Sequence, residues 1–249
     1  MRTIRNKLLA ISFQLALLVA LVGLASCGTQ VAGPSSSGNS GSQIDWVNFA
    51  RFGGISYVLP YERVGRGLTS SDLGPVYATV HFKLEGTIHD PAYQAKDGDA
   101  AFLDVGTHMY TVKGYLPTFR LAAYLDGLLQ LYEADTNPRA RTGADLLDIA
   151  GKVRYIGITS EQDGVTELGA IRNARQVAAL VALILRAPVN QQYVSQGSTR
   201  YFIALHLLDG TAVIRSYWLD LGELSRGMLL PGAFKTAVEQ ALQQRKSRP

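Results

Sequence analysis

In the first half of the chain, short apolar runs alternate with residues that favour turns. Two pairs of runs flank Gly53-Gly54 and Asp126-Gly127, dipeptides that allow the positive φ angles of a tight hairpin turn. The strands predicted for this half are 46–52, 55–59, 76–84, 100–103, 109–112, 119–125 and 128–133. Within 76–84, apolar and polar side chains alternate with the period of two of a half-buried strand. This spacing of short strands predicts a small β-barrel or a rolled antiparallel sheet, and the pattern does not choose between them.

In the second half, helical spacing joins the strand pattern. Asn173 can cap a helix whose apolar residues continue at helical spacing until Pro188 stops it. Pro231 suits the first turn of a second helix. Strands are predicted at 153–158, 165–170, 201–208, 211–218 and within 223–229. The order strand-strand-helix-strand-strand-strand-helix predicts an α+β fold with two helices packed on an antiparallel sheet.

The polar stretch from Glu133 to Thr142, broken by Pro138, predicts a boundary between two subdomains. We expect a mostly β subdomain over 44–135 and an α+β subdomain with a basic tail over 143–249. Residues 28–43 consist largely of Gly, Ser and other small or polar residues, which predicts a flexible tether.

The N-terminus combines a basic start, an apolar run and small residues before the single cysteine of the chain. The segment Leu24-Ala25-Ser26-Cys27 resembles the lipobox of bacterial lipoproteins. The resemblance implies that residues 1–26 are a signal peptide and that Cys27 carries a covalent diacylglycerol at the membrane surface. An uncleaved membrane helix, or a secretory signal with an incidental cysteine, is the alternative. The region 145–242 also resembles uncharacterised secreted and lipid-anchored bacterial proteins, a resemblance that carries no functional residues.

The net positive charge nearly disappears if the signal peptide is removed. Cleavage takes away three of the 24 Lys and Arg side chains and leaves 21 against 20 Asp and Glu. Clustered basic residues occur only at the end of the chain, in Arg245, Lys246 and Arg248. This distribution argues against nucleic acid as a partner. The tail could contact anionic lipid headgroups or be a solvated terminus.

Two groups of residues invite a metal-site hypothesis. Asp97, Asp99 and Asp104 surround a glycine, but they lack the regular spacing of a calcium loop. Asp-Gly and Asp-Pro are also common in turns. The four histidines, His81, His89, His108 and His206, show no metal-ligand spacing. His206 alternates with Phe202, Ala204 and Leu208, which favours an edge or hydrogen-bonded histidine over a ligand.

Aromatic and basic residues gather between positions 110 and 132. Tyr and Arg are enriched in binding interfaces, so Tyr115 and Arg120 are candidates for one. The alternative is the ordinary preference of aromatic residues for strands.

These features predict an extracytoplasmic, lipid-anchored binding or structural module of the cell envelope, with an envelope protein or glycan as partner. No cofactor is predicted, and no sequence motif indicates an enzyme. One alternative is a metal-dependent hydrolase of envelope polymers that uses His89, Asp90, Asp97 and Asp99. A second is a sensor that partners a membrane protein.

Overall fold

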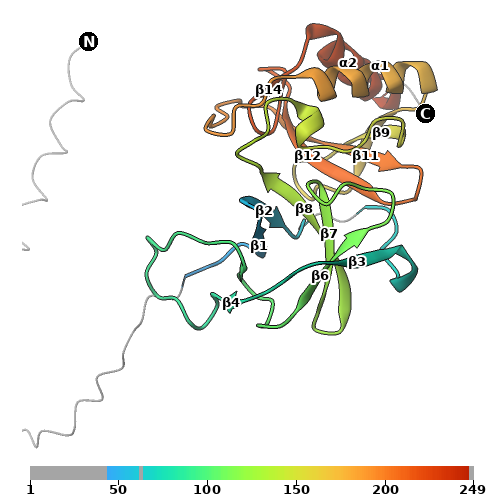
Figure 1. Ribbon diagram of the computed structural model, residues 1–249. Helices are drawn as coiled ribbons and strands as arrows, with labels where there is room; N and C mark the ends of the chain where they lie inside the picture. The colour runs from blue at the N-terminus through green and yellow to red at the C-terminus, as the bar shows by residue number, and fades with distance from the viewer. Residues whose placement is uncertain (1–43, 62–63, 247–249) are drawn as a thin grey trace, which may run out of the picture. The chain divides into compact units, whose positions relative to one another are not determined.

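The computed structural model describes residues 44–61 and 64–246, and the fold is mostly β with two helices (Figure 1). The predicted signal peptide, Cys27, the tether and Arg248 lie outside the described residues. In chain order the elements are β1 (Phe49–Phe52), β2 (Ile55–Val58), η1 (Ser70–Asp72), β3 (Leu73–Thr79), β4 (Phe82–Lys83), β5 (Asp99–Ala100), β6 (His108–Val112), β7 (Arg120–Leu125), β8 (Leu128–Thr136), η2 (Gly143–Asp145), β9 (Val153–Thr159), β10 (Glu167–Ile171), α1 (Ala174–Arg186), β11 (Arg200–Leu207), β12 (Ala212–Trp218), β13 (Glu223–Leu224), β14 (Met228–Leu229) and α2 (Gly232–Lys246). In this described part of the chain, neither helix has both the length and the apolar character needed to cross a bilayer.

Strands β1 to β8 form one curled sheet, called here the N-terminal sheet. Its strand order is β3-β6-β7-β8-β2-β1-β5-β4, and every neighbouring pair is antiparallel except β4 and β5. Gly53 and Gly54 join β1 to β2 with φ angles of 56° and 76°, and Asp126 and Gly127 join β7 to β8 with 51° and 76°. Two consecutive positive φ angles are what a type I′ turn requires, so both predicted hairpins are confirmed.

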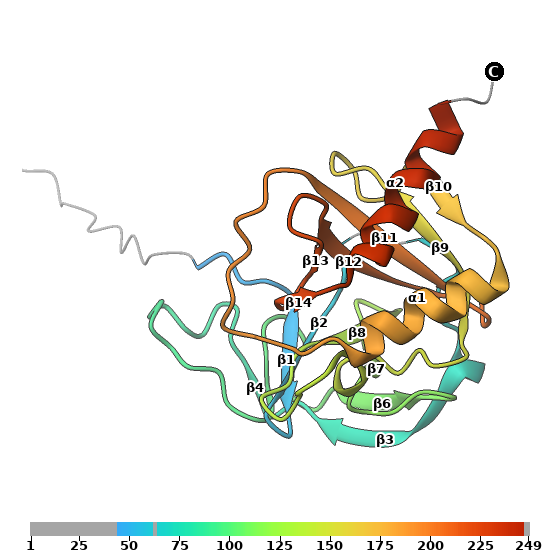
Figure 2. The ribbon, with the colours of Figure 1, turned by 90° about the horizontal axis from the view of Figure 1, so that it is seen from above.

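Strands β9 to β14 form the second sheet, called here the C-terminal sheet. It is antiparallel, with the order β10-β9-β11-β12-β13-β14. Both helices lie over one of its faces, and its other face is turned toward the N-terminal sheet (Figures 1 and 2). The α+β class predicted from the sequence is therefore correct in outline.

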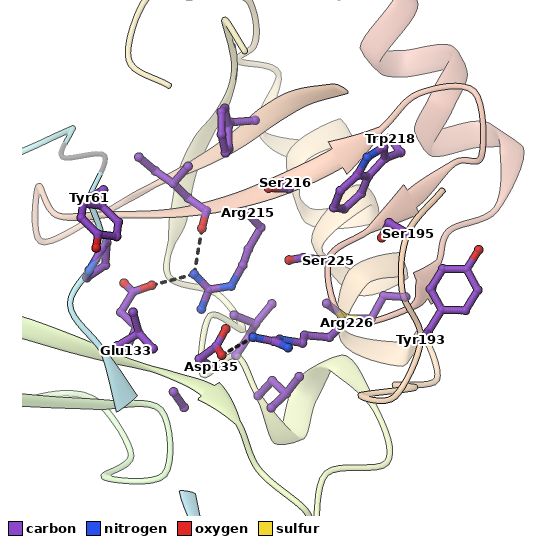
Figure 3. Close-up of a pocket in the computed structure, with 18 of the residues that line it drawn as sticks. Tyr61, Glu133, Asp135, Tyr193, Ser195, Arg215, Ser216, Trp218, Ser225 and Arg226 are labelled. Atoms are coloured by element: carbon purple, nitrogen blue, oxygen red, sulfur yellow. Dashed lines mark hydrogen bonds and ion pairs between the residues drawn. The ribbon is translucent and has the colours of Figure 1, made fainter. Parts of the chain in front are cut away.

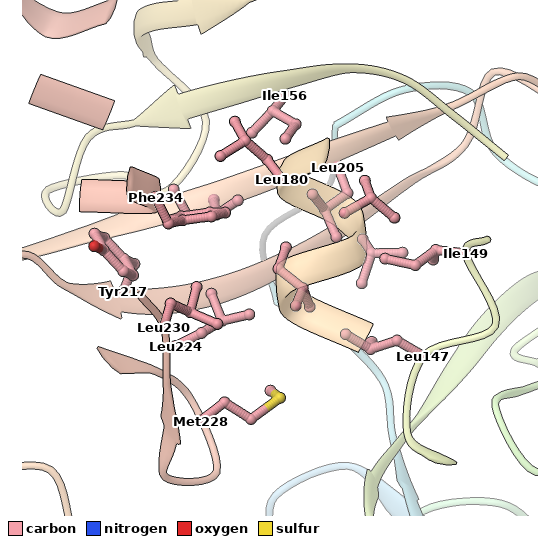
Figure 4. Close-up of a cluster of buried hydrophobic side chains, with 14 of the residues drawn as sticks. Leu147, Ile149, Ile156, Leu180, Leu205, Tyr217, Leu224, Met228, Leu230 and Phe234 are labelled. Atoms are coloured by element: carbon pink, nitrogen blue, oxygen red, sulfur yellow. The ribbon is translucent and has the colours of Figure 1, made fainter. Parts of the chain in front are cut away.

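The main hydrophobic core lies between the two helices and the C-terminal sheet (Figure 4). Val177, Leu180, Val181 and Ile184 of α1 are buried, which matches the helical spacing read from the sequence. The N-cap prediction is also confirmed, because Asn173 Oδ1 accepts a hydrogen bond from the Gln176 N–H at 3.0 Å. Each large apolar side chain buried here stabilises the fold by about 1.5–3 kcal/mol.

Two predicted strands are wrong as single elements. The run 76–84 breaks after Thr79, because Val80 N–H bonds to Thr107 while His81 N–H bonds to Gly98, so the chain changes its pairing partner. The run 223–229 is instead a hairpin of β13 and β14, so four strands follow α1 rather than three. Arg226 and Gly227 make its turn, with φ angles of 70° and 66°.

The polar stretch predicted as a boundary overlaps the end of a strand. Strand β8 continues through it as far as Thr136, and Glu133 is only 3% exposed. The polar residue Glu133 therefore lies within a buried part of β8.

Candidate functional site

A cavity of about 550 Å³ lies where the two sheets meet (Figure 3). Its wall on the N-terminal side comes from the end of β2 and from β8, and the opposite wall from β12 and the β13–β14 hairpin. The charged side chains in the wall are Glu133, Asp135, Arg215 and Arg226, and the aromatic ones are Tyr61, Tyr193, Phe202 and Trp218.

Glu133 and Arg215 of this wall belong to a cluster in which two arginines share one carboxylate. Arg120 and Glu133 are directly opposite each other in the β7–β8 ladder. Arg120 Nε and Nη2 donate to Glu133 Oε1 at 3.2 and 2.7 Å, and Arg215 Nη1 of the other sheet donates to Oε2 at 2.8 Å. The side chains of Arg120, Glu133 and Arg215 are 0%, 4% and 17% exposed. We call these three residues the ionic joint, because they link the two sheets.

Further contacts of Arg120 extend the ionic joint. Its Nη1 donates to Thr211 Oγ1 and its Nη2 to the Ala212 carbonyl, both at 2.9 Å and both in the C-terminal sheet region. Its guanidinium also lies 4.9 Å from the centre of the Tyr115 ring and 4.8 Å from that of Phe119. Cation–π contacts at this distance are favourable, and more so away from water.

The interface predicted around Tyr115 and Arg120 is thus an internal one. Tyr115 is half-buried, and its hydroxyl donates to Asp209 Oδ2 at 2.8 Å, across to the C-terminal sheet. Arg120 is fully buried, so the expectation that it contributes to an external binding surface is wrong. Burial and the hydrogen bond to Asp209 raise the pKa of Tyr115 to about 12. Tyr115 therefore stays a neutral donor at neutral pH.

The charge state of Glu133 follows from its neighbours. Burial alone would raise the pKa of its carboxyl, but the charges of Arg120 and Arg215 and their hydrogen bonds outweigh burial and lower the pKa. The carboxylate is therefore ionised at neutral pH. A carboxylate held in this state by two arginines is a poor proton donor and a weak base.

Asp135 and Arg226 form a second ion pair across the cavity (Figure 3). Arg226 holds a φ of 70° in the turn between β13 and β14. A left-handed conformation costs a residue with a Cβ about 1–2 kcal/mol. From this turn, the side chain of Arg226 extends to Asp135 in strand β8 of the N-terminal sheet.

One edge of the cavity is covered by the segment between α1 and β11. Ser195 Oγ donates to Glu223, whose other oxygen is buried without a partner among the described residues. Further along, the Ser198 and Thr199 N–H groups donate to Asp220 at 2.9 and 3.3 Å. Gly197 lies against Trp218, where a Cβ would come within 2.5 Å of the indole. This segment therefore holds Trp218 in place at the cavity wall.

The predicted metal candidates are not brought together as one site. Asp97 accepts from Gly54 N–H at 2.8 Å, Asp99 accepts from Tyr93 Oη and Lys96 N–H at 2.9 and 2.7 Å, and Asp104 pairs with Lys83 at 3.1 Å. Asp90 accepts from Ala92 N–H at 2.9 Å, and His89 is exposed. Across residues 44–61 and 64–246, no three His, Cys, Asp or Glu side chains are grouped as metal ligands.

The other histidines are equally scattered. His81 and His108 are exposed, and His108 shares a hydrogen bond with Thr79 at 3.1 Å. His206 is half-buried and stacks on Tyr155 with ring centres 4.1 Å apart. Burial first, and then the charges of Arg154 and Arg172, lower the pKa of His206 to about 4. The His206 imidazole is therefore neutral at neutral pH.

The residues that build the cavity wall were missed by sequence reasoning. Glu133 and Asp135 were assigned to a polar boundary, and Arg215 was one polar position in a predicted strand. The available signal was the charge itself, because Arg120, Glu133 and Arg215 interrupt strands that are otherwise rich in apolar residues. A charge inside a buried strand needs a partner of opposite sign.

No family model, no curated protein and no solved structure matches this chain.

Proposed function

We propose that this chain is a lipid-anchored protein of the bacterial cell envelope that binds a small polar molecule in the cavity between its two sheets. The anchor is supported by the resemblance of Leu24-Ala25-Ser26-Cys27 to a lipobox, behind a basic and apolar start. Two acyl chains on Cys27 would hold the protein stably at a membrane surface.

The observation that carries the binding function is the cavity itself. Small-molecule sites usually measure about 300–1,000 Å³ and combine apolar walls with a few fixed polar groups. Here the volume is about 550 Å³, and the aromatic walls stand beside charged groups from both sheets. Because Glu133 and Asp135 are already bound by arginines, the cavity is suited to hold a ligand more than to transfer protons.

The test compares ligand binding by the unmodified full chain, in a neutral detergent, with binding by a variant whose cavity is filled by a larger side chain. The probe is the fraction below about 1 kDa extracted from the bacterial envelope, a mass that matches the size of such cavities. We expect this fraction to raise the thermal unfolding midpoint of the unmodified protein, because a ligand that binds only the folded state stabilises it.

Ser216 lines the cavity, so Ser216→Phe should abolish this rise. Thr236→Phe, on the exposed side of α2, is the matched control and should keep it. An equal rise in both variants, or no rise in the unmodified protein, would contradict binding in the cavity.

A further inference from the structure

We infer that the cavity receives an anionic group of its ligand, a carboxylate or a phosphate, on the guanidinium of Arg215. This inference rests on the proposed binding function and specifies the chemistry of the ligand. Arg215 reaches from β12 into the space beside Glu133 and Ser225 (Figure 3).

The hydrogen bonds of Arg215 use only one corner of its guanidinium. Nη1 donates to Glu133 Oε2 and to the Ile214 carbonyl, each at 2.8 Å. Among the described residues, Nε and Nη2 have no hydrogen-bond partner, and neither atom is sealed from solvent. These two atoms form one edge of the planar fork, with parallel N–H groups that match the two oxygens of a carboxylate or phosphate.

The carboxylates in the wall are already occupied by other arginines. Both oxygens of Glu133 accept hydrogen bonds, from Arg120 and from Nη1 of Arg215. Asp135 is paired with Arg226. Arg120 directs its own donors at Glu133, Thr211 and Ala212.

Arg215 shares its one ion-pair partner in the described part of the chain, Glu133, with Arg120, and Asp135 pairs with Arg226. Asp209 is a further carboxylate near Arg120, whose charge helps to lower the pKa of Asp209. Arginine keeps its charge at any physiological pH. The Nε and Nη2 edge of Arg215 is therefore left for a further anion, and the low dielectric of a half-buried site strengthens its attraction for one.

The rest of the wall defines the body of the ligand. Trp218 and Tyr193 offer aromatic faces, and Ser195, Ser216 and Ser225 offer hydroxyl groups. These groups fit a small molecule with an acidic group and a ring or an apolar body.

Trp218 allows a direct test, because it lines the same cavity as Arg215. Trp46 is the only other tryptophan, and Trp46→Phe makes Trp218 the single indole fluorophore of the full chain. Fluorescence quenching is measured with acrylamide, iodide and caesium at constant ionic strength. A guanidinium with an unfilled donor edge in the cavity wall attracts anions and repels cations. Each quenching constant is divided by the constant for free N-acetyltryptophanamide, because iodide quenches free indole more efficiently than caesium does. After this division, we expect iodide to quench Trp218 at least about threefold more effectively than caesium.

Three variants assign the effect to Arg215. Arg215→Gln should bring the normalised iodide and caesium constants close together, while Arg215→Lys should keep the preference for iodide. Arg154→Gln, at an exposed arginine outside the cavity wall, is the matched control and should change nothing. Inorganic phosphate and acetate are then added separately to compete with iodide in the unmodified cavity. Protection by one and not the other identifies the anion class, and Arg215→Lys should weaken it because lysine lacks the paired donors.

The outcomes separate this inference from the proposed function. If acrylamide reaches Trp218 but iodide has no advantage over caesium, or if neither anion protects, the anion site is wrong and the cavity remains open to a neutral ligand. If acrylamide does not reach Trp218 at all, the cavity does not admit small molecules and both proposals fail.

Discussion

Glu133 holds the two sheets together at the scale of a single residue, since its two oxygens are bound by arginines of different sheets. A buried ion pair of this kind contributes little net stability compared with an apolar pair of equal volume. Removing one member is costly, because the remaining charges stay buried without compensation. The ionic joint therefore acts mainly by fixing the position of one sheet against the other. Its net contribution to the free energy of unfolding is small.

Glu133→Gln tests this role. The substitution keeps the size of the side chain and removes the charge of the carboxylate that Arg120 and Arg215 share. We expect the free energy of unfolding in urea to fall by about 3 kcal/mol. Asp104→Asn, which removes the exposed partner of Lys83, should cost less than about 1 kcal/mol. Similar losses in the two variants would show that the joint is no more important than a surface pair.

His206 gives the fold a defined pH dependence. Its pKa falls from the ordinary histidine value of 6.5 to about 4 in the folded chain. The unfolded chain therefore binds a proton that the folded chain does not, and stability decreases as the pH drops from about 6.5 toward 4. In His206→Gln, the midpoint of urea unfolding should change less with pH over this window than it does in the unmodified chain. His89→Gln, at an exposed position, should keep the pH dependence of the unmodified chain.

Glu133 acts in a lower pH range, so the two effects can be told apart. Its pKa lies below the ordinary glutamate value of 4.5, and its contribution is therefore complete above about pH 5 and lost as the pH falls through the folded pKa. A pH profile of His206→Gln that matches the unmodified chain between 6.5 and 4 would contradict the assignment to His206.

At the scale of elements, local chemistry predicted the turns and helix ends. Gly53-Gly54 and Asp126-Gly127 adopt positive φ angles that few other residues tolerate, and Asn173 caps α1 through its own side chain. Local chemistry did not predict where strands change partners. The break after Thr79 depends on Thr107 and Gly98, which lie far along the chain. Alternation alone therefore cannot locate it.

The β13–β14 turn carries a prediction of its own. Arg226→Gly and Arg226→Ala both lose the ion pair with Asp135, which is partly exposed and worth at most about 1 kcal/mol. Only glycine relieves the left-handed backbone at this position. We expect the glycine variant to be more stable than the alanine variant by about 1 kcal/mol in urea unfolding. Equal stabilities would mean that the turn of residues 225–227 does not hold Arg226 in the left-handed region.

At the scale of the whole molecule, the candidate site could not be read from the sequence. Arg120, Glu133, Arg215 and Arg226 come from strands and a turn of both sheets, and only the packing of one sheet on the other brings them together. The α+β class followed from the order of the elements, because periodicity is a local property. The cavity did not, because it depends on residues far apart in the chain, such as Glu133 and Arg215, which are separated by 82 positions.

Native mass spectrometry of the full chain, purified from its own bacterial membranes in a neutral detergent, examines the lipid anchor and the bound molecule together. We expect a protein that begins at Cys27, carries the mass of a lipid anchor, and releases a bound small molecule of acidic character on activation. Ser216→Phe should keep the anchor mass and lose the small molecule. A chain that retains residues 1–26 without acylation, and that carries no bound molecule, would contradict both the lipid anchor and the binding function.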